Sequence, residues 1–299
     1  MIHHKPVMVD EVVSALQPRS DGRYIDCTNG EGGHAEAILG HCDPPARLLG
    51  LDLDREALAA AEARLAGFRE TTTLVETSYV NIAEVAAEHD FLPCDGVLFD
   101  LGVSSLQLDN TSRGFAFSKE AALDMRFGPS IGRSAKEIVN DTDEESLANL
   151  IYRLGEERRS RRIARAIVRA RPVETTVELA DVVAGAIGRR SRGRRSIHPA
   201  TRTFQALRIA VNGELDNVEA GIRAAIGTLR QGGRLVVISY HSLEDRLVKN
   251  LLREESKPVD ENRSPALRLI TKRVRKPETS EIEANPRSRS ARMRAAERL

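Results

Sequence analysis

The stretch RYIDCTNGEGGH, residues 23–34, decides the fold of this 299-residue chain. Its first half, from Arg23 to Thr28, has the composition of a short buried strand, and its second half is a glycine-rich turn. The apolar spacing of residues 35–39 then indicates a helix. Glycines in such a turn let a ligand approach the backbone closely, and the first N–H groups of the helix point towards it. The stretch therefore predicts a strand, a tight turn and a helix beside a ligand site.

The alternation of strand and helix continues on both sides of this stretch. An apolar run ends in Asp52, and Asp54 is a suitable N-cap for the helix that follows. Short connections of this kind favour parallel strands with helices on both faces of the sheet. The sequence therefore predicts an α/β fold with a doubly wound, Rossmann-like sheet. Its predicted strands are residues 23–28, 48–52, 73–76 and 96–100, and its predicted helices are residues 9–16, 35–39, 57–65 and 83–89.

A long insertion interrupts the sheet after the fourth strand. The next strand, residues 234–240, follows a turn at residues 231–233 and begins about 130 residues later, whereas a parallel crossover needs only about a dozen. Residues 267–270 and 291–295 then predict a terminal hairpin. The predicted domains are residues 1–103 with 211–299 for the sheet, and residues 104–210 for an inserted helical domain.

One long helix is expected to lead back from the insertion into the sheet domain, starting near Pro199. One face of it carries Arg202, Gln205, Arg208 and Asn212, which either line a cleft or form an ordinary solvated face. The neighbouring face is an apolar stripe that spans about 80° of arc. The residues of this stripe are Phe204, Leu207, Val211, Leu215, Val218 and Ile222.

The composition excludes several classes of protein. Hydrophobic residues make up 41% and charged residues 30% of the chain, which is the balance of a folded soluble protein. No apolar run approaches the roughly 18 residues that cross a bilayer, and the first residues lack the apolar stretch of a signal peptide. The three cysteines show no CxxC spacing and the seven histidines no HxxH spacing. We therefore expect a cytoplasmic protein without a membrane partner, a disulfide scaffold or a metal site.

Charge is distributed unevenly behind the net value of +1. Between Arg153 and Arg208 there are fifteen arginines, no lysine and five acids, and residues 257–299 carry twelve Lys or Arg against six acids. The rest of the chain is correspondingly acidic. A basic block of this size favours a polyanion such as nucleic acid over a merely solvated arginine-rich surface.

The glycine turn and the acid that ends the second strand predict a nucleotide-like cofactor. Asp52 comes twenty residues after Gly32, where an acid accepts hydrogen bonds from ribose hydroxyls. The turn formally matches the dinucleotide pattern G-x-G-x-x-A, so NAD is one alternative. However, two further acids, Asp26 and Asp100, end neighbouring strands. These acids would repel a pyrophosphate and attract a sulfonium cation, which favours S-adenosylmethionine.

Several motifs of this chain together resemble those of one known family. The chain resembles the bacterial ribosomal RNA small subunit methyltransferase H family, the 16S rRNA cytosine-N4 methyltransferases, from His4 to Ser290. Several long motifs in the same order make the resemblance specific. They are DCTNGEGGH at residues 26–34, DLGVSSLQLD at 100–109, RGF at 113–115, LDMR at 123–126, IHPATRTFQ at 197–205, SYHSLEDR at 239–246 and NPRSRS at 285–290.

The resemblance implies a class I S-adenosylmethionine-dependent methyltransferase with a helical insertion. Its substrate would be one cytidine of 16S rRNA in the decoding, P-site region of the small ribosomal subunit, bound by a monomer or homodimer. By motif, the cofactor contacts would be Gly32, Gly33, His34, Asp52, Tyr79, Asp100 and Gln107. Tyr79 would lie on the adenine, where many family members have Phe.

Methylation of an exocyclic amine requires a hydrogen-bond acceptor near the nitrogen, whose lone pair is delocalised into the ring. Asp100 is the candidate catalytic acceptor by its position after the fourth strand. Candidates for holding the base or its phosphates are His198, Arg202, Arg208, His241 and Ser242. Two alternatives remain open at this stage: an NAD-dependent dehydrogenase, and a ribosome-assembly factor that binds RNA without catalysis.

Overall fold

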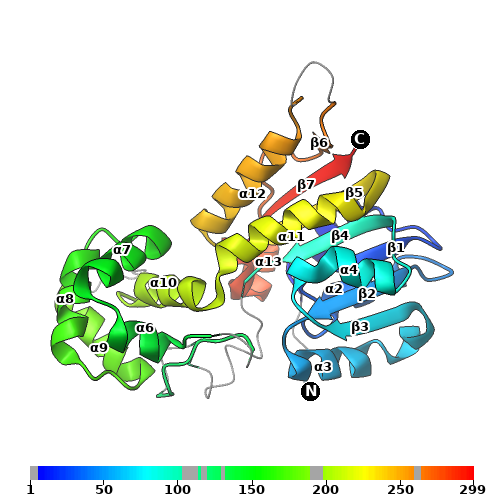
Figure 1. Ribbon diagram of the computed structural model, residues 1–299. Coiled ribbons are helices and arrows are strands. Elements are labelled where there is room, and N and C mark those ends of the chain that lie inside the picture. The colour runs from blue at the N-terminus through cyan, green and yellow to red at the C-terminus, as the bar shows by residue number, and fades with distance from the viewer. Residues whose placement is uncertain (1–5, 103–113, 116–119, 129–131, 189–197, 259–263) are drawn as a thin grey trace. The chain divides into compact units, whose positions relative to one another are not determined.

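The structure is a computed structural model that describes residues 6–102, 114–115, 120–128, 132–188, 198–258 and 264–299. The chain divides into two compact units (Figure 1). We call Met1–Gly102 with Leu215–Leu299 the sheet unit, and Val103–Glu214 the helical unit. Gln107, which the resemblance places at the cofactor, lies outside the described residues.

The sheet unit is built on seven strands in the order β3-β2-β1-β4-β5-β7-β6. Strands β1 to β5 are parallel, and β7 is antiparallel to both of its neighbours. The predicted doubly wound α/β sheet is confirmed, with the terminal hairpin as its last two strands. The strands are β1 (Arg23–Asp26), β2 (Arg47–Asp52), β3 (Thr72–Glu76), β4 (Cys94–Asp100), β5 (Leu229–Ser239), β6 (Leu267–Leu269) and β7 (Arg292–Arg298).

Helices cover both faces of this sheet, because side chains of successive strand residues point to opposite faces. Ile25, Leu49 and Phe99 belong to the core under one set of helices, whereas Tyr24 and Leu48 belong to the core under the other. The first set is α4 (Ile82–Glu88), α11 (Glu214–Thr228) and α12 (Ser242–Glu255). The second set includes α1 (Val9–Leu16) and α2 (Gly33–Gly40), with α3 (Arg55–Arg64) and η1 (Ala66–Thr71) towards the β3 edge.

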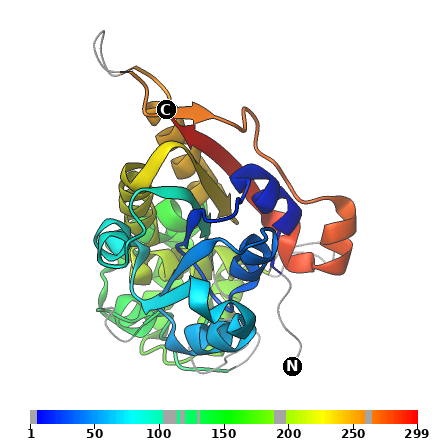
Figure 2. The same cartoon turned by 90° about the vertical axis from the view of Figure 1, so that its right-hand side faces the viewer.

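The helix α13 (Thr279–Ala284) lies beside α1, as Figure 2 shows. The N–H of Met8 donates to Glu281 Oε1 at 2.7 Å, which joins α13 to the segment before α1. The short helix η4 (Pro286–Ser290) then leads into β7. The segment that leads into β7 is therefore held against the first helix.

Strand β5 begins earlier than the sequence predicts. The predicted turn at residues 231–233 lies inside the strand as an irregularity: Leu229 pairs with Cys94, and Arg234 pairs with Gly96. Gly232 takes the left-handed conformation, with φ of 75°, that this bulge requires. The glycines that signal a turn in the sequence are accommodated here as a bulge between two paired segments.

The helical unit has one hydrophobic core of its own, to which its helices all contribute. Two of these helices, α6 and α9, begin with reciprocal capping boxes from Ser134 and Thr175. Its described helices are α6 (Ala135–Asp141), α7 (Glu144–Gly155), α8 (Ser160–Ala170), α9 (Thr176–Ile187) and α10 (Thr201–Asn212).

The expectation of one continuous helix after Pro199 is wrong. The chain forms α10 and then α11, and Gly213 between them has φ of 57° and ψ of 32°, a left-handed conformation that ends α10. The apolar stripe is therefore divided. Phe204, Leu207 and Val211 belong to the core of the helical unit, and Val218 and Ile222 belong to a core of the sheet unit.

Within the described residues, no helix has the length and apolar character needed to cross a membrane.

Replacing Gly213 with Ala tests this helix break. A Cβ at a left-handed position costs about 1–2 kcal/mol, which corresponds to a fall of roughly 2–8 °C in Tm for units of this size. Gly227 is the matched control, because it lies in α11, has no positive φ, and leaves at least 4 Å of open space around the position a Cβ would take. Gly227→Ala should leave Tm unchanged or raise it slightly. Calorimetry that shows equal effects of both changes would contradict the assigned break.

Candidate functional site

The candidate site lies at the carboxyl ends of the central strands of the sheet unit. Asp26 ends β1, Asp52 ends β2 and Asp100 ends β4, while Tyr240 directly follows β5. In doubly wound sheets, ligands bind outside the carboxyl ends of the strands, at the point where the strand order reverses. That point falls here between β1 and β4, which are neighbours and from which the strand order runs in opposite directions along the sheet.

The Asp52 carboxylate holds the glycine turn in place. Its Oδ2 accepts the N–H of Gly30 at 2.8 Å, and its Oδ1 accepts the N–H of Asp54 at 2.9 Å. Burial raises the pKa of Asp52, and the two N–H groups oppose this rise. Each oxygen keeps a second lone pair that can accept from a ligand hydroxyl. The carboxylate that the sequence assigns to ribose binding therefore also fixes the backbone of the turn.

The glycines of the turn are required by close packing. Gly32 has φ of 77° and is the N-cap of α2, and a Cβ there would lie 3.3 Å from Ala61 and Leu65. A Cβ on Gly33 would lie 2.9 Å from Pro6. These contacts bring the first turn of α2 against its neighbours and leave its N-terminal N–H groups at the site.

Two buried ionisable groups, Asp26 and His34, lie beneath the turn. Asp26 is 1% exposed and His34 is 5% exposed. Asp26 Oδ1 accepts the N–H of Thr28 at 3.1 Å, whereas its Oδ2 and the Nδ1 of His34 have no hydrogen-bond partner among the described residues. Burial raises the pKa of Asp26 to about 7, although His34 lowers it. Burial lowers the pKa of His34, but the carboxylate of Asp100 outweighs this and leaves that pKa raised.

Asp100 is held from three sides. Its backbone N–H donates to Thr28 Oγ1 at 2.6 Å, and the hydroxyl of Tyr240 donates to its Oδ1 at 2.7 Å. His34 Nε2 lies 3.4 Å from its Oδ2, and 22% of the Asp100 side chain stays exposed. Burial and the Asp100 charge raise the pKa of Tyr240 well above its ordinary value, so its hydroxyl keeps the proton it donates. Asp100 is thus an oriented, reachable acceptor.

Tyr240 was missed as a site residue in the sequence. It lies within the SYHSLEDR motif, directly after the predicted fifth strand, and β5 pairs with β4 in the sheet. The pairing of β5 with β4 is the signal that could have identified Tyr240, because it brings the residue after β5 next to the residue that ends β4. The sequence does not show that a hydroxyl 140 residues away reaches Asp100.

Tyr79 lies in η2 (Tyr79–Asn81), just after β3, and is half-buried. Its ring meets Phe99 edge-on, with the centroids 5.5 Å apart and the planes at 74°. A Cβ on Gly221 of α11 would lie 2.6 Å from the Tyr79 ring, so this glycine makes room for it. One side of the ring is therefore packed against the protein at the carboxyl end of the sheet.

His241 and Ser242 form the start of α12. His241 is the N-cap of that helix: its Nδ1 accepts the N–H of Glu244 at 3.3 Å, and its Nε2 lies 3.0 Å from Glu244 Oε1. Glu244 is 1% exposed, and its Oε2 accepts the N–H of Tyr240 at 2.8 Å. His241 therefore has a structural role as a cap, which also fixes the backbone of Tyr240.

The other candidate substrate residues belong to the helical unit and are bonded within it. His198 Nδ1 accepts the N–H of Ala200 at 3.2 Å, next to the start of α10. Arg202 donates to the carbonyl of Glu156 at 3.2 Å, and 56% of its side chain is exposed. Arg208 forms a two-pronged ion pair with Glu214, with both distances 2.8 Å. His198 and Arg202 are exposed and Arg208 is half-buried, so the first two keep surface for a further partner.

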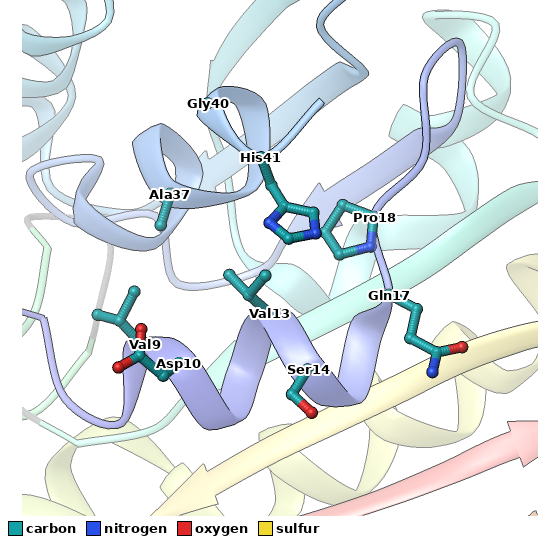
Figure 3. Close-up of a pocket in the computed structure, with 9 residues that line it drawn as sticks. All are labelled: Val9, Asp10, Val13, Ser14, Gln17, Pro18, Ala37, Gly40 and His41. Atoms are coloured by element: carbon teal, nitrogen blue, oxygen red, sulfur yellow. The ribbon is translucent and has the colours of Figure 1, made fainter. Parts of the chain in front are cut away.

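A hollow between α1 and α2 is unrelated to these groups (Figure 3). Val13 and Ala37 form its apolar walls, and His41 lies at the C-terminal end of α2. The glycine turn begins at the opposite end of this eight-residue helix, about 12 Å away at 1.5 Å per residue. We assign no ligand to this hollow.

The arrangement at the strand ends fits S-adenosylmethionine. Three carboxyl groups, those of Asp26, Asp52 and Asp100, surround the turn, and the free Oδ2 of Asp26 is a buried acceptor that a cationic group would satisfy. The same carboxyl groups would repel a pyrophosphate. The sheet also differs from the usual dinucleotide-binding order 3-2-1-4-5-6, because an antiparallel β7 lies between β5 and β6.

Fold and site together define an S-adenosylmethionine-dependent methyltransferase with a Rossmann-like sheet. The chain belongs to the MraW methylase family, whose model matches residues 1–299. It is 51% identical over 305 residues to a ribosomal RNA small subunit methyltransferase H of Dehalococcoides mccartyi, covering 99% of this chain and 86% of that protein. The protein of the same name from Syntrophobacter fumaroxidans is 45% identical, covering 99% and 97%. Membership of a methylase family excludes the dehydrogenase alternative.

Among solved structures, the fold is similar to that of an rRNA methylase from Streptococcus thermophilus, with a TM-score of 0.45 and 11% identity. The alignment covers 100% of this chain and 99% of that one.

Asp26→Asn tests the buried acid. An acid whose pKa is about 7 when folded and 3.8 when unfolded loses stability as pH rises between those values, because the unfolded chain releases its proton first. The neutral Asn removes this loss, so without cofactor the variant should gain stability relative to the wild type between pH 5 and pH 8. The gain is on the order of a few kcal/mol at most, at 1.36 kcal/mol per pKa unit.

Asp95→Asn is the control with the opposite sign. Burial alone would raise the pKa of Asp95, but the N–H of Arg23 and the guanidinium of Arg230 outweigh burial and lower it. Asp95 therefore stabilises the fold above its ordinary pKa, and its Asn variant should be less stable at neutral pH. Thermal unfolding of both variants from pH 5 to pH 8 measures the difference. An Asp26→Asn effect that does not change with pH would show that Asp26 is ionised in the folded protein.

Asp52→Ala should weaken S-adenosylmethionine binding by about 1.5–3 kcal/mol, the range for a lost hydrogen bond to a charged group. The change also leaves the N–H groups of Gly30 and Asp54 without their acceptor, so the turn loosens. Glu62→Ala, on the exposed side of α3, is the matched acid-to-alanine control and should bind as the wild type does. Calorimetric titration that finds equal affinities for both variants would refute the role of Asp52.

Proposed function

We propose that this chain transfers a methyl group from S-adenosylmethionine to the exocyclic N4 of one cytidine in 16S rRNA of the small ribosomal subunit, in the decoding region. The relatives named above carry the rRNA part of this proposal in their names. The choice of cytosine N4 as the reacting atom rests on the resemblance of the quoted sequence motifs to those of the cytosine-N4 methyltransferases. A cytoplasmic location follows from the substrate.

The exposed surface of α8 is the observation that supports RNA as the substrate. This helix buries Ile163, Ala164 and Ile167 in the core of the helical unit. Its other side presents exposed arginines, and at 100° per residue they share about 100° of arc on one face. These arginines are Arg161, Arg162, Arg165 and Arg169.

The cations of this arginine face are available to phosphates. Only Arg165 has an ion-pair partner in the described part of the chain, Glu144 at 3.4 Å, and that pair is exposed. An exposed row of guanidinium groups binds phosphates with two-pronged geometry and without reading sequence. We therefore assign substrate recognition to the inserted domain, residues 104–210 of the sequence.

Asp100 is proposed as the acceptor for the reacting amine. Bound S-adenosylmethionine supplies the methyl group. Tyr240 and Thr28 fix Asp100, and the exposed part of its carboxylate accepts a hydrogen bond from the N4 amine as the nitrogen becomes tetrahedral. A cytosine in a base-paired stack cannot reach this position, so the target nucleotide must be unstacked.

Gly32, Gly33, His34, Asp52 and Tyr79 are the proposed cofactor contacts, as is Gln107 outside the described residues. Asp52 would accept from the ribose hydroxyls while it holds Gly30. The Tyr79 ring would cover the adenine with the side that does not face Gly221. The carboxyl groups around the turn would stabilise the sulfonium charge.

Mapping of methylation tests the function directly. Purified 30S particles and free 16S rRNA from cells lacking the protein are incubated with it and labelled S-adenosylmethionine, and mass spectrometry locates the label. The expected product is one N4-methylcytidine. Label on another atom or another RNA would overturn the assignment, and RNA binding without transfer would favour an assembly factor.

Replacing Arg161, Arg162 and Arg169 with Ala tests the arginine face. Loss of three phosphate contacts should flatten the slope of log K against log salt concentration for 16S rRNA by roughly 2 units, at 0.7–0.9 per contact. Binding of S-adenosylmethionine should not change. Arg133→Ala serves as the control, because Arg133 is a cation of the same unit outside α8 and is 56% exposed. If the triple variant keeps the wild-type salt slope, the arginines of α8 do not contact RNA phosphates and only face solvent.

A further inference from the structure

The sheet unit is electrically polarised along its strand order. Residues 1–102 contain seven Lys or Arg and eighteen Asp or Glu, whereas residues 257–299 contain twelve and six. The acidic segment supplies β2 and β3 at one edge of the sheet, and the basic segment supplies β7 and β6 at the other. The fold thus places the basic segment at one edge of the sheet, while the opposite edge is built from the acidic segment.

A small hollow lies at the basic edge, where α12 contacts β6 and β7. Its walls carry two cations from α12, one from the segment after β6 and one from β7. These are Lys249, Arg253, Lys272 and Arg294. We call this cluster the hairpin cation site.

Two acids on the elements that line this site, Asp245 of α12 and Glu297 of β7, are already paired. Asp245 accepts from Arg294 at 2.7 Å. Glu297 accepts from Arg268 at 2.6 Å. In the part of the chain that the structure describes, no acid pairs with Lys249 or Lys272. Asp245 offsets the charge of Arg294, so the repulsion that remains in the hollow is between Lys249, Arg253 and Lys272. This repulsion costs free energy unless an anion binds among them.

We propose that the hairpin cation site binds the phosphate backbone of RNA, as a second contact besides the arginine face of α8. This inference rests on the proposed rRNA substrate. The neighbouring residues 264–276 carry five Lys or Arg and no acid, so the positive surface extends beyond the hollow as an extended polyanion requires. Residues 241–299 contain no Phe, Tyr or Trp, so bases cannot stack there, and the contact is independent of sequence.

The sheet unit would therefore help to hold the substrate despite the acids around its cofactor turn. A contact of this kind positions the RNA without recognising the target base. The short range of the field limits the repulsion from the acidic edge, because charges in about 0.1 M salt are screened beyond roughly 10 Å.

Lys272→Glu and Arg69→Glu form a matched pair that tests the site. Both positions are exposed and both changes alter the net charge equally, but Arg69 lies on η1 beside β3, at the opposite edge of the sheet. Binding of 16S rRNA is measured at several salt concentrations. Lys272→Glu should weaken binding roughly three- to tenfold near 0.1 M salt and reduce the salt slope by about 0.7–0.9. Arg69→Glu should stay within about twofold of the wild type.

Lys249→Glu repeats the test from the α12 side of the hollow and should weaken binding to a similar extent. Unchanged S-adenosylmethionine affinity and Tm exclude damage to the fold. If both lysine variants bind RNA as Arg69→Glu does, the inference is overturned while the proposed function stands. If the wild type does not bind 16S rRNA at all, the proposed function fails, and this inference fails with it.

Discussion

The structure of the site depends on the hydrogen bonds that the Asp52 carboxylate accepts from two backbone N–H groups. One of them ties the glycine turn after β1 to the end of β2, and the other starts α3. The turn contains glycines in left-handed conformations, which have little intrinsic preference for one shape. The half-buried carboxylate gives the turn a single conformation, and so orients the first N–H groups of α2 towards the ligand.

A second constraint is the burial of ionisable groups at the carboxyl end of β1 and the start of α2. Asp26 and His34 are almost completely buried and keep polar atoms without partners among the described residues, a costly arrangement in a folded chain. Such groups are typical of ligand sites, where the bound molecule supplies the missing contacts. Asp100 differs from Asp26 because Tyr240 and Thr28 hold it and part of its surface stays open. Two acids at the ends of neighbouring strands thus have different environments and suit different roles.

The cofactor turn and the surfaces proposed to bind RNA carry opposite charges, a difference that the net charge of the chain does not show. The acids around the turn suit a cationic cofactor, whereas the substrate that we propose is a polyanion. The exposed cations lie on elements other than those that carry the acids of the turn. They lie on the outer face of α8 in the helical unit, and at the β6 edge in the sheet unit. Screening by salt then lets one chain attract both ligands.

The sequence by itself determined the elements that depend on local pattern: the five parallel strands, the glycine turn, the Asp54 cap of α3 and the terminal hairpin. It also identified Asp52 and Asp100, because an acid at the end of a buried strand is visible in the sequence. Only the tertiary structure decided which distant side chains and helices contact the residues of the site. Tyr240 reaches Asp100 because β5 pairs with β4, and His241 caps α12 rather than being left free for a ligand. Gly213 divides one apolar stripe between two cores, although the spacing of the stripe continues through it. Periodicity reports which side of an element is buried, but the partner on that side is set by strand order and by contacts between distant segments.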